Sequence, residues 1–418
     1  MMTEAHSAKT EIIFWHSFAD NLERELKAIT QGFNQSQSDY TIKPVYKGEY
    51  MESLINFAAA FRANQAPALI QIFEVGSMAV LYPKGVVKPL FEILDAQHMS
   101  LPIDDFFPAV RAFYSDSSQT GKERLLAMPF NISLPVVYYN ADALNAVGYS
   151  SGFPETWQEM ETLMIKLKAA GFHCGYTTAY PAWIHIESFS ALHGLPLFDP
   201  LTGQAAYNNF FVLSHLERLK RWQEEGLFEY GGRDSNATVL FTSGRCPLFS
   251  QSSGAYNSLQ EVVKFNLGVA QLPLDKQVTL KRQANLIGGA AIWSVANQTP
   301  TVYRGIALFF KYLAEVKVQQ RWYENTGYLP IGLKGQYASF SEASHPILRL
   351  AKTELNLQNP SQFPQIVGPQ NLIRIRNDEA LEALFAGIKT PKEALETAVR
   401  RANYLLKRFS QNTKSSPH

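Results

Sequence analysis

Residues 49–77 read "EYMESLINFAAAFRANQAPALIQIFEVGS" and predict a helix, a turn and a buried strand in direct succession. Apolar residues recur at helical spacing as far as Phe57 and Phe61, "NQAP" is typical of a turn, and "ALIQIF" is a short apolar run typical of a buried strand. Tyr50 stands at the start of this unit, and Glu74 directly follows its strand. The pattern therefore places two polar side chains at the ends of an otherwise apolar α/β unit.

The residues before this stretch show the same alternation of strand and helix. "EIIFWHS" and "TIKPVYKG" favour strands, and between them Leu26, Ile29 and Phe33 lie on one face of a helix. Alternating strands and helices predict parallel strand pairing through right-handed crossovers. In such sheets, ligands bind beyond the carboxyl ends of the strands. We therefore expect Tyr50 and Glu74 to line a ligand-binding crevice.

A second α/β pattern begins near residue 134. "LPVVYYN" and "HCGYTTA" favour strands, and Thr156 and Glu159 form a capping box at the start of the helix predicted between them. A later helix, "TPKEALETAVRRANYLL", begins with the same arrangement at Thr390 and Glu393. A chain of 418 residues exceeds what one core usually organises, and no flexible linker separates the two patterns. The sequence thus predicts two α/β domains in close association.

The composition is that of a globular protein, with 46% apolar residues and a net charge of +1 from 38 Lys and Arg against 37 Asp and Glu. No basic run could neutralise a row of phosphates, so nucleic acid and anionic membranes are not expected partners. No apolar run is long enough for a membrane helix. The first residues do not resemble a signal peptide, so the protein is expected either to stay inside the cell or to have lost a leader.

Two further local features follow from the sequence. Cys174 and Cys246 are too few and too far apart for a metal cluster, and both a single disulfide and two buried thiols remain open. The last eight residues, "QNTKSSPH" (411–418), are expected to form a disordered tail.

The sequence offers no strong motif of an enzyme or a metal site. It contains no P-loop, no dinucleotide-binding GxGxxG and no HExxH. His185 and Glu187 in "WIHIES" and the later His193 do not have the spacing of a metal site, and we expect them on a helix surface. Glu49 and Glu74 could be paired on paper as the carboxylates of a glycosidase, but many glutamate pairs would serve equally well. We therefore expect no catalysis, no metal and no cofactor.

Tyr180 and Trp183, in "TTAYPAWIHIES", are candidates for a stacking surface. They lie three residues apart, so both rings could face one cleft and cover the C–H face of a small polyol or sugar. Packing in the core is the alternative for either ring. Pro181 favours a loop over a helix at this position, which supports the cleft.

Strings distributed along the chain resemble one family of binding proteins. They include "FWHSF", "YKGEY", "AAFRANQAPALIQIFEVGS", "WIHIESFSALHGLPL", "LIGGAAIW", "NTGYLPI" and "TPKEALETAVRRANYLLKRF", in this order between residues 10 and 410. They are similar to the periplasmic glycerol-3-phosphate-binding proteins of bacterial ABC importers, within the extracellular solute-binding family that includes maltose-binding proteins. The resemblance implies a two-lobe periplasmic-binding-protein-like α/β fold with a hinge between its domains.

The resemblance also implies lobe boundaries and ligand-binding residues. The N-terminal lobe would comprise residues 10–133 and 286–327, and the C-terminal lobe residues 134–285 and 328–410. The residues that the family motifs assign to ligand binding are Tyr50, Glu74, Ser133, Ser252, Gly289, Tyr328 and Arg374.

These residue types suit a phosphate monoester. The Arg374 guanidinium would form bidentate, charge-assisted bonds with the phosphate. The hydroxyls of Tyr50 and Tyr328 and the N–H of Gly289 would fill the remaining acceptor positions. Glu74 would repel the phosphate and is therefore expected to accept bonds from the glycerol hydroxyls.

The function that the resemblance implies is that of the solute-binding component of an ABC importer. Such a protein would work in the periplasm as a monomer, capture sn-glycerol 3-phosphate, and deliver it to a membrane permease. Glycerophosphodiesters such as glycerophosphocholine are further candidate ligands. Tyr180 stands where the family has a tryptophan, while Trp183 is retained, and this departure bears on the ligand range. The alternatives are a sugar- or oligosaccharide-binding protein of the same family and, more remotely, a glycoside hydrolase or phosphodiesterase.

Overall fold

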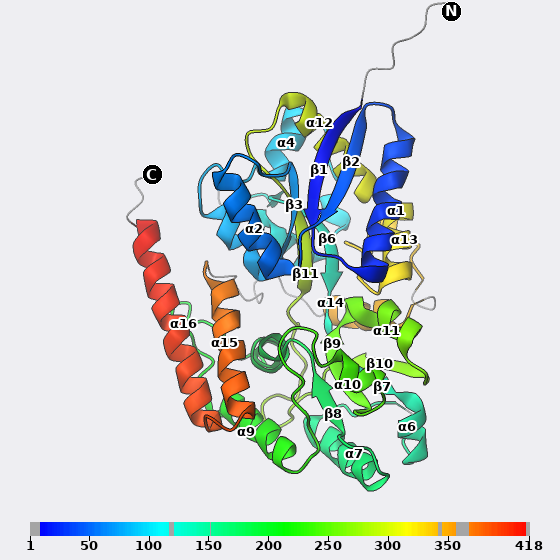
Figure 1. The fold of residues 1–418 in the computed structure, drawn as a ribbon, viewed down its shortest axis with the longest axis vertical. Helices are drawn as coiled ribbons and strands as arrows, with labels where there is room; N and C mark the ends of the chain where they lie inside the picture. The colour runs from blue at the N-terminus through cyan, green and yellow to red at the C-terminus, as the bar shows by residue number, and fades with distance from the viewer. Residues whose placement is uncertain (1–8, 117–120, 151, 342–344, 357–367, 415–418) are drawn as a thin grey trace, which may run out of the picture. The chain divides into compact units, whose positions relative to one another are not determined.

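A computed structural model describes five segments of the chain, and Figure 1 shows their course. These segments are residues 9–116, 121–150, 152–341, 345–356 and 368–414. The chain divides into two compact units. Unit 1 holds Met1–Ile132 and Gly288–Ser344, and unit 2 holds Ser133–Ile287 and His345–His418. The chain therefore passes from one unit to the other three times.

The segment 328–344 differs from the sequence-based expectation, because it belongs to unit 1 and not to the second lobe. Two of its short backbone hydrogen bonds tie it to the rest of unit 1. The Leu329 N–H donates to the Ile132 carbonyl at 2.7 Å, and the Phe107 N–H donates to the Ile331 carbonyl at 2.9 Å. Tyr328 is thereby placed in unit 1.

A five-stranded sheet forms the centre of unit 1, in the order β2-β1-β3-β11-β6. Its strands are β1 (Thr10–His16), β2 (Tyr40–Tyr46), β3 (Leu69–Phe73), β6 (Met128–Ser133) and β11 (Gly288–Ser294), and a separate small ladder joins β4 (Ser115–Asp116) and β5 (Arg124–Leu125). β1 pairs in parallel with β2 and β3, as the alternation of strand and helix predicts. β11 runs antiparallel to β3 with Ala290 opposite Phe73. This is the last pair of the ladder. Gly289 precedes it in β11, and Glu74 follows it at the start of a 3-10 turn that contacts β11.

Helices pack against the strands of unit 1. They are α1 (Asp20–Ser36), α2 (Tyr50–Arg62), α3 (Met78–Leu81), α4 (Leu90–Ala96), α5 (Pro108–Tyr114), α12 (Pro300–Leu313) and α13 (Val316–Thr326), with 3-10 turns at Glu74–Gly76, Ile103–Asp105 and Gly335–Tyr337. α1 buries Leu26, Ile29 and Phe33, as their spacing predicts. Phe33 meets Phe309 of α12 edge-on, with ring centroids 5.2 Å apart, and α1 also lies against α13 (Figure 1). The apolar face of α1 thus joins the two segments of unit 1.

Unit 2 is built on a four-stranded sheet in the order β10-β7-β9-β8. Its strands are β7 (Pro135–Asn140), β8 (Tyr176–Thr178), β9 (Leu248–Ser252) and β10 (Leu267–Gln271). β7 is antiparallel to β9 and β10, whereas β8 is parallel to β9. Its helices are α6 (Ala141–Ala146), α7 (Trp157–Ala169), α8 (Phe189–Leu192), α9 (Phe210–Glu224), α10 (Thr238–Thr242), α11 (Tyr256–Val262), α14 (Pro346–Asn356), α15 (Gln370–Phe385) and α16 (Pro391–Lys414), with a π-helix at Trp183–Ser188 and a 3-10 turn at Ser253–Ala255.

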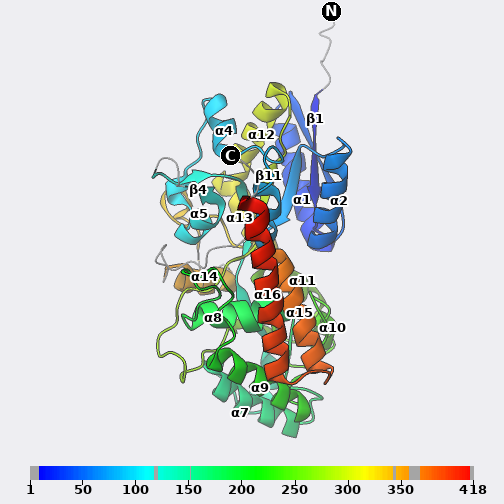
Figure 2. The ribbon, with the colours of Figure 1, turned by 90° about the vertical axis from the view of Figure 1, so that its left-hand side faces the viewer.

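Both predicted capping boxes are confirmed. Thr156 accepts from the Glu159 N–H while the Glu159 carboxylate accepts from the Thr156 N–H, and α7 begins there. Thr390 and Glu393 do the same at the start of α16. Figure 2 shows α15 and α16 side by side, and their contacts close one side of the unit 2 core.

The segment after Pro181 is helical, so the loop expected there is wrong. Residues 181 and 182 are already helical, and the π-helix Trp183–Ser188 follows directly. Proline is tolerated in the first turn of a helix, because the N–H that it lacks would have no partner inside the helix. The proline therefore begins this helix and does not exclude it.

α16 is the longest helix of the described chain, and it continues further than expected. It runs to Lys414, so residues 411–414 belong to a helix and not to a disordered tail. No glycine or proline stops the helix in this stretch. Residues 415–418 of the expected tail lie outside the described residues. No helix within the described ranges combines the length and the apolar character needed to cross a membrane.

Cys174 and Cys246 form a disulfide, which settles the choice that the sequence left open. Their Cα atoms lie 4.9 Å apart, and the bond spans 72 residues of sequence. It joins the residues just before β8 to those just before β9, two strands that pair in parallel. Disulfides persist mainly in oxidising compartments.

Candidate ligand-binding residues

Unit 1 places four of the predicted ligand-binding residues at the ends of neighbouring elements. Tyr50 is the first residue of α2, and Glu74 directly follows β3. Gly289 is the second residue of β11, which contacts the 3-10 turn that begins at Glu74. Tyr328 comes directly after the left-handed Gly327 that ends α13.

Asn131 links these residues and was not foreseen from the sequence. Its side-chain amide donates to the Tyr50 hydroxyl at 2.9 Å and accepts from the Gln71 amide at 2.8 Å. Gln71 in turn accepts from the Ser17 N–H at 2.9 Å. Asn131 and Gln71 are both buried, within β6 and β3. The only signal in the sequence is one amide in each of two apolar strands, "PFNIS" and "LIQIF".

Tyr328 completes this polar cluster. Its ring stacks on Trp322 with an interplanar angle of 2° and ring centroids 5.7 Å apart. Burial raises the pKa of the Tyr328 phenol to about 12, although hydrogen bonds with Asn131 and Tyr50 oppose the rise. The phenol therefore stays protonated at physiological pH and is able to donate a hydrogen bond.

Gly289 has to be glycine for two reasons. Its φ of +101° is rarely adopted by residues with a side chain, and an added Cβ would lie 1.7 Å from the Asn131 carbonyl oxygen. This close approach brings the start of β11 against β6. Glu74 is 4% exposed, and its charge also contributes to the raised pKa of Tyr328. The structure thus brings together Tyr50, Glu74, Gly289 and Tyr328, and their role in ligand binding stays a prediction.

Ser133 ends β6 and is the first residue of unit 2, and Ser252 ends β9 within unit 2. Pro135 is opposite Ser252 in the β7–β9 ladder. The Ser253 N–H donates to the Leu134 carbonyl at 2.8 Å, and the Ser253 hydroxyl accepts from the Leu134 N–H at 3.1 Å. The Ser252 hydroxyl accepts from the Gly254 N–H at 3.2 Å and so caps the short turn that follows β9. Its own proton can still be donated.

The two candidate aromatic residues form an edge-on pair with ring centroids 6.1 Å apart. Trp183 is 5% exposed and packs in an apolar cluster with Val137, Leu192 and Leu272. Its indole N–H has no hydrogen-bond partner among the described residues. Tyr180 is partly buried and has a φ of +43°. This environment matches the packing alternative for Trp183, and its role as a stacking platform stays a prediction.

Arg374, on α15, forms a two-pronged ion pair with Glu187. Its Nε donates to Glu187 Oε1 at 2.8 Å and its Nη2 donates to Oε2 at 2.6 Å. The exposed fractions of the two side chains are 17% and 5%. Arg376 instead points to Glu379 and is exposed. Arg374 is therefore the guanidinium that is joined to the π-helix carrying Trp183.

The expectation that His185, Glu187 and His193 lie on a helix surface is wrong, because all three are buried. Asp378, one turn after Arg374, adds a second carboxylate link between α15 and this helix. It accepts from the Ala182 N–H at 3.0 Å, and burial raises its pKa to about 7. A carboxyl with this pKa is partly protonated near neutral pH, which reduces the negative charge around Arg374.

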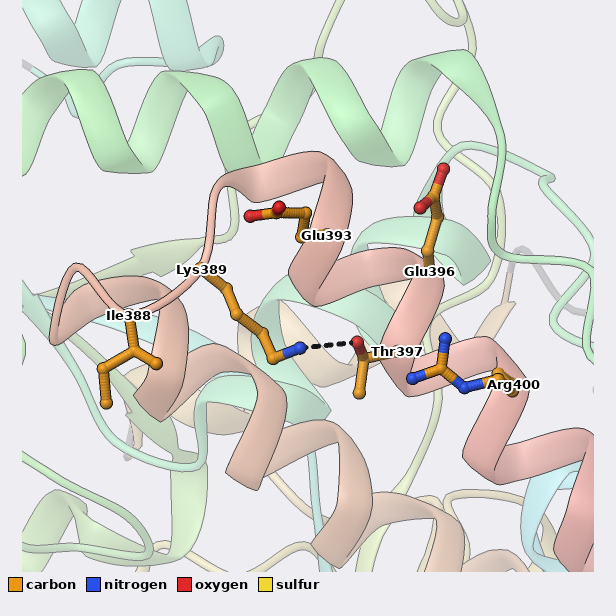
Figure 3. A pocket seen from close by; sticks show the side chains of 6 residues that line it. All are labelled: Ile388, Lys389, Glu393, Glu396, Thr397 and Arg400. Atoms are coloured by element: carbon orange, nitrogen blue, oxygen red, sulfur yellow. Dashed lines mark hydrogen bonds between the residues drawn. The ribbon is translucent and has the colours of Figure 1, made fainter.

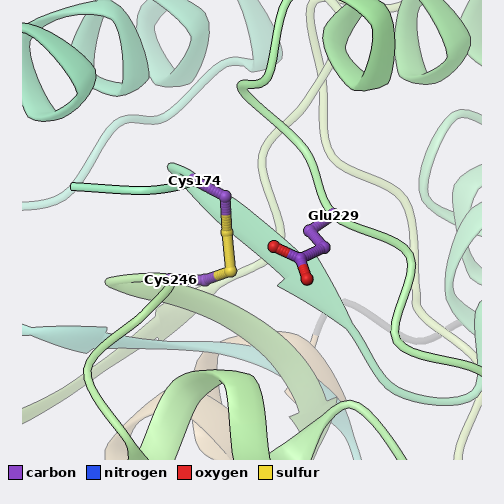
Figure 4. A group of neighbouring side chains, drawn as sticks. All are labelled: Cys174, Glu229 and Cys246. Carbon is purple, nitrogen blue, oxygen red and sulfur yellow. A yellow bond between two sulfur atoms is a disulfide. The ribbon is translucent and has the colours of Figure 1, made fainter.

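Two other groups of side chains do not form a ligand site. Figure 3 shows a surface pocket of about 340 Å³ at the turn between α15 and α16, lined by Ile388, Lys389, Glu393, Glu396, Thr397 and Arg400. It contains none of the predicted residues, and Glu393 is already engaged in the helix cap. Figure 4 shows Glu229 beside the two cysteines, but the disulfide leaves them no thiolate for a metal, and Glu229 pairs with Arg245.

One pentapeptide has the spacing of a serine-hydrolase motif, "GYSSG" at 148–152. In those enzymes the serine sits on a turn from a strand into a helix. Here the pentapeptide begins two residues after the end of helix α6. Its position along the chain therefore does not match that of a nucleophile elbow.

Comparison with known proteins gives sequence relatives along almost the whole chain. Residues 28–339 match a family described as bacterial extracellular solute-binding protein. The chain is 37% identical to the sn-glycerol-3-phosphate-binding periplasmic protein UgpB of Yersinia pseudotuberculosis, over 97% of this chain and 94% of the relative. It is also 37% identical to UgpB of Escherichia coli O1:K1 / APEC, over 98% of this chain and 95% of the relative.

Solved structures match the fold. UgpB from Mycobacterium tuberculosis, in complex with glycerophosphocholine, superposes with a TM-score of 0.80 at 18% identity, over 96% of this chain and 100% of that chain. The GacH receptor of Streptomyces glaucescens, solved unliganded and with acarbose, gives a TM-score of 0.80 at 18% identity, over 96% and 99% of the two chains. The expected two-lobe, periplasmic-binding-protein-like α/β fold is thereby confirmed. Together with the sequence relatives, this means that the chain belongs to the bacterial extracellular solute-binding protein family.

Proposed function

We propose that this protein captures sn-glycerol 3-phosphate in the periplasm and delivers it to the membrane permease of an ABC importer, with glycerophosphodiesters such as glycerophosphocholine as further ligands. The observation that carries the proposal is the near full-length identity to the sn-glycerol-3-phosphate-binding periplasmic proteins. The protein binds its ligand as a monomer and makes or breaks no bond. The disulfide between Cys174 and Cys246 supports an oxidising compartment.

The unit 1 residues suit a ligand that is rich in oxygen atoms. The phenols of Tyr50 and Tyr328 and the N–H of Gly289 supply neutral donors, and Asn131 holds Tyr50 in place. Glu74 offers a carboxylate beside these donors, and hydroxyl groups of a glycerol moiety are suitable partners for it. The neutral donors suit phosphate oxygens, and the carboxylate suits the glycerol hydroxyls.

Arg374 in unit 2 suits the phosphate group. A guanidinium has five N–H donors, and Glu187 takes up one at Nε and one at Nη2. This pair fixes the plane of the guanidinium, so that little side-chain freedom is lost when the guanidinium binds a phosphate. The phosphate adds charge-assisted bonds to a group that is already oriented. A protein with a net charge of +1 therefore needs no basic patch to bind a dianion.

The second candidate function is the binding of a sugar or oligosaccharide. The edge-on pair of Tyr180 and Trp183 favours it, because aromatic faces are typical of sugar sites. A neutral sugar, however, has no group that requires Arg374. The two candidates therefore differ in the net charge of the ligand.

Calorimetric titration with sn-glycerol 3-phosphate, glycerophosphocholine and maltose separates them. We expect micromolar or tighter binding of sn-glycerol 3-phosphate, the same in the presence of a chelator because no metal is proposed. A heat of binding with maltose, and none with sn-glycerol 3-phosphate or glycerophosphocholine, would overturn the proposal in favour of the sugar.

Substitution of Gly289 tests the unit 1 residues. Gly289→Ala would place a Cβ against the Asn131 carbonyl and displace the N–H proposed to meet the ligand, so we expect binding to weaken by about 1.5–3 kcal/mol. Gly244→Ala is the matched control, because Gly244 also has a positive φ, of +77°, but no atom lies within 4 Å of an added Cβ. Equal affinity of both variants, measured by calorimetry well below their melting temperatures, would exclude Gly289 from the site.

Substitution of Arg374 tests the phosphate contact. Arg374→Lys keeps the charge but loses the planar fork, so we expect a cost of about 1.5–3 kcal/mol in binding, and Arg374→Ala should cost more. Arg376→Ala removes an exposed neighbouring guanidinium and should bind as the wild type does. If Arg376→Ala loses affinity while Arg374→Ala keeps it, the phosphate contact is assigned to the wrong arginine.

A further inference from the structure

A continuous hydrogen-bonded chain of polar groups crosses the interior of unit 2. In order, its members are Arg218, His215, His185, Tyr176, Ser250, Thr178 and the carbonyl of Ala179. We call this set the Arg218 chain. The side chains from His215 to Thr178 have no exposed surface. Such a long polar path through an apolar core is costly unless every group is satisfied.

Each link in the chain has hydrogen-bonding geometry. Arg218 Nη1 lies 3.2 Å from His215 Nδ1, and His215 Nε2 lies 3.0 Å from His185 Nδ1. His185 Nε2 lies 3.0 Å from the Tyr176 hydroxyl, which also bonds to Ser250. The last two links, from Ser250 to Thr178 and from Thr178 to the Ala179 carbonyl, are both 2.8 Å long.

The two ends of the chain impose one direction on all of its protons. Arginine can only donate, so His215 Nδ1 must accept and His215 Nε2 must carry the proton. The same logic makes His185 accept at Nδ1 and donate from Nε2 to Tyr176. At the other end a carbonyl can only accept, so Thr178 donates to it and must accept from Ser250. One arrangement of protons therefore satisfies every member.

Burial keeps both histidines of the chain neutral. It lowers the pKa of His185 to about 3 and holds the pKa of His215 well below its usual value. Arg218 is fixed in turn by the Asp275 carboxylate. The Asp275 N–H donates to His193 Nε2 at 2.7 Å, and His193 Nδ1 bonds to the Phe189 carbonyl at 2.6 Å. His193 must therefore carry its proton on Nδ1, the opposite nitrogen from the other two.

The chain ends at the backbone of one candidate ligand-binding residue. The Ala179 carbonyl and the Tyr180 N–H belong to the same peptide group, and this N–H donates to the Asp234 carbonyl at 2.8 Å. Both polar atoms of the peptide are thus held. Tyr180 adopts a φ of +43°, in the left-handed region that is unfavourable for a residue with a side chain. Such a conformation persists only where its surroundings fix it.

The chain also passes through the π-helix that carries the other candidates. His185 lies two residues after Trp183 and two residues before Glu187, the partner of Arg374. π-helices are rare and occur frequently at functional sites. The hydrogen bonds on both sides of the His185 ring therefore fix the rotation of this helix.

We propose that the Arg218 chain is a positioning device for ligand binding, in which Tyr176, His185 and His215 orient Tyr180 and the Trp183–Glu187 segment. An apolar core of the same volume would pack equally well but would impose no orientation on the peptide and the π-helix. A broken link leaves a buried donor without an acceptor, which raises the free energy of the folded state. The structure lowers this penalty by moving, and the binding residues move with it. This inference rests on the proposed function, because ligand affinity is one of its readouts.

Two variants at one position test the proposal. His185→Gln keeps the order of the chain, since its amide oxygen can accept from His215 and its amide N–H can donate to Tyr176. His185→Leu has similar bulk and breaks both links. We expect His185→Leu to weaken binding of sn-glycerol 3-phosphate about tenfold, and His185→Gln to stay within about threefold of the wild type.

A control and a substitute variant keep the test decisive. Leu163→Ala removes a buried side chain from the same core without touching the Arg218 chain, and should lower the melting temperature with an unchanged Kd. If His185→Leu does not fold, Tyr176→Phe removes a single oxygen of the chain and should also weaken binding. NMR of protein with 15N-labelled histidine supplies an independent readout, with the proton expected on Nε2 of His185 and His215 and on Nδ1 of His193.

The outcomes are separable. Wild-type binding together with unchanged affinity in His185→Leu, or in Tyr176→Phe where that variant is used, would overturn the positioning role. Equal weakening in His185→Gln and His185→Leu would also overturn it, and so would a different tautomer at His185 or His215. If the wild type binds no glycerophosphate compound, the proposed function itself fails, and this inference fails with it.

Discussion

The buried amide of Asn131 is the interaction on which the candidate ligand-binding residues of unit 1 depend. Its side chain holds the Tyr50 hydroxyl and is itself held by Gln71 from β3, while its backbone carbonyl lies where any side chain at position 289 would be. A buried amide has to be satisfied, because each missing hydrogen bond costs about 1–3 kcal/mol. The strands β3, β6 and β11 are therefore fixed relative to one another at the edge where Glu74 lies.

Unit 2 uses the same physical solution with a larger set of groups. Glu187 orients Arg374, Asp378 holds the start of the π-helix, and the Arg218 chain crosses the core behind them. In each case a buried polar group is matched to a partner in a different element. A nearly neutral protein can recognise a charged ligand in this way, because oriented donors in a low-dielectric interior act more strongly than mobile charges at the surface.

Local features of the fold could be predicted from the sequence. The capping boxes at Thr156 and Thr390 depend on residues three positions apart, and the buried face of α1 depends on a spacing of three and four. The position of Glu74 follows from a general rule for the ends of parallel strands. All of these arise from interactions between sequence neighbours or from the topology of an α/β sheet.

The contacts that complete the candidate site could not be predicted in the same way. Glu187 and Arg374 are separated by 187 residues, and Asn131 and Tyr50 by 81 residues. A polar residue in an apolar string carries no information about its distant partner, so Asn131 and His185 were not recognised. The helix after Pro181 was missed because proline is compatible both with a loop and with the first turn of a helix.

The central claim is that the protein recognises a phosphate ester through the Arg374 guanidinium that Glu187 orients, and a titration of the wild type and Arg374→Lys with sn-glycerol 3-phosphate tests it most directly. The account predicts one sn-glycerol 3-phosphate per chain in the wild type and a lower affinity in Arg374→Lys. Failure of the wild type to bind sn-glycerol 3-phosphate, or equal affinity of the two proteins, would contradict it.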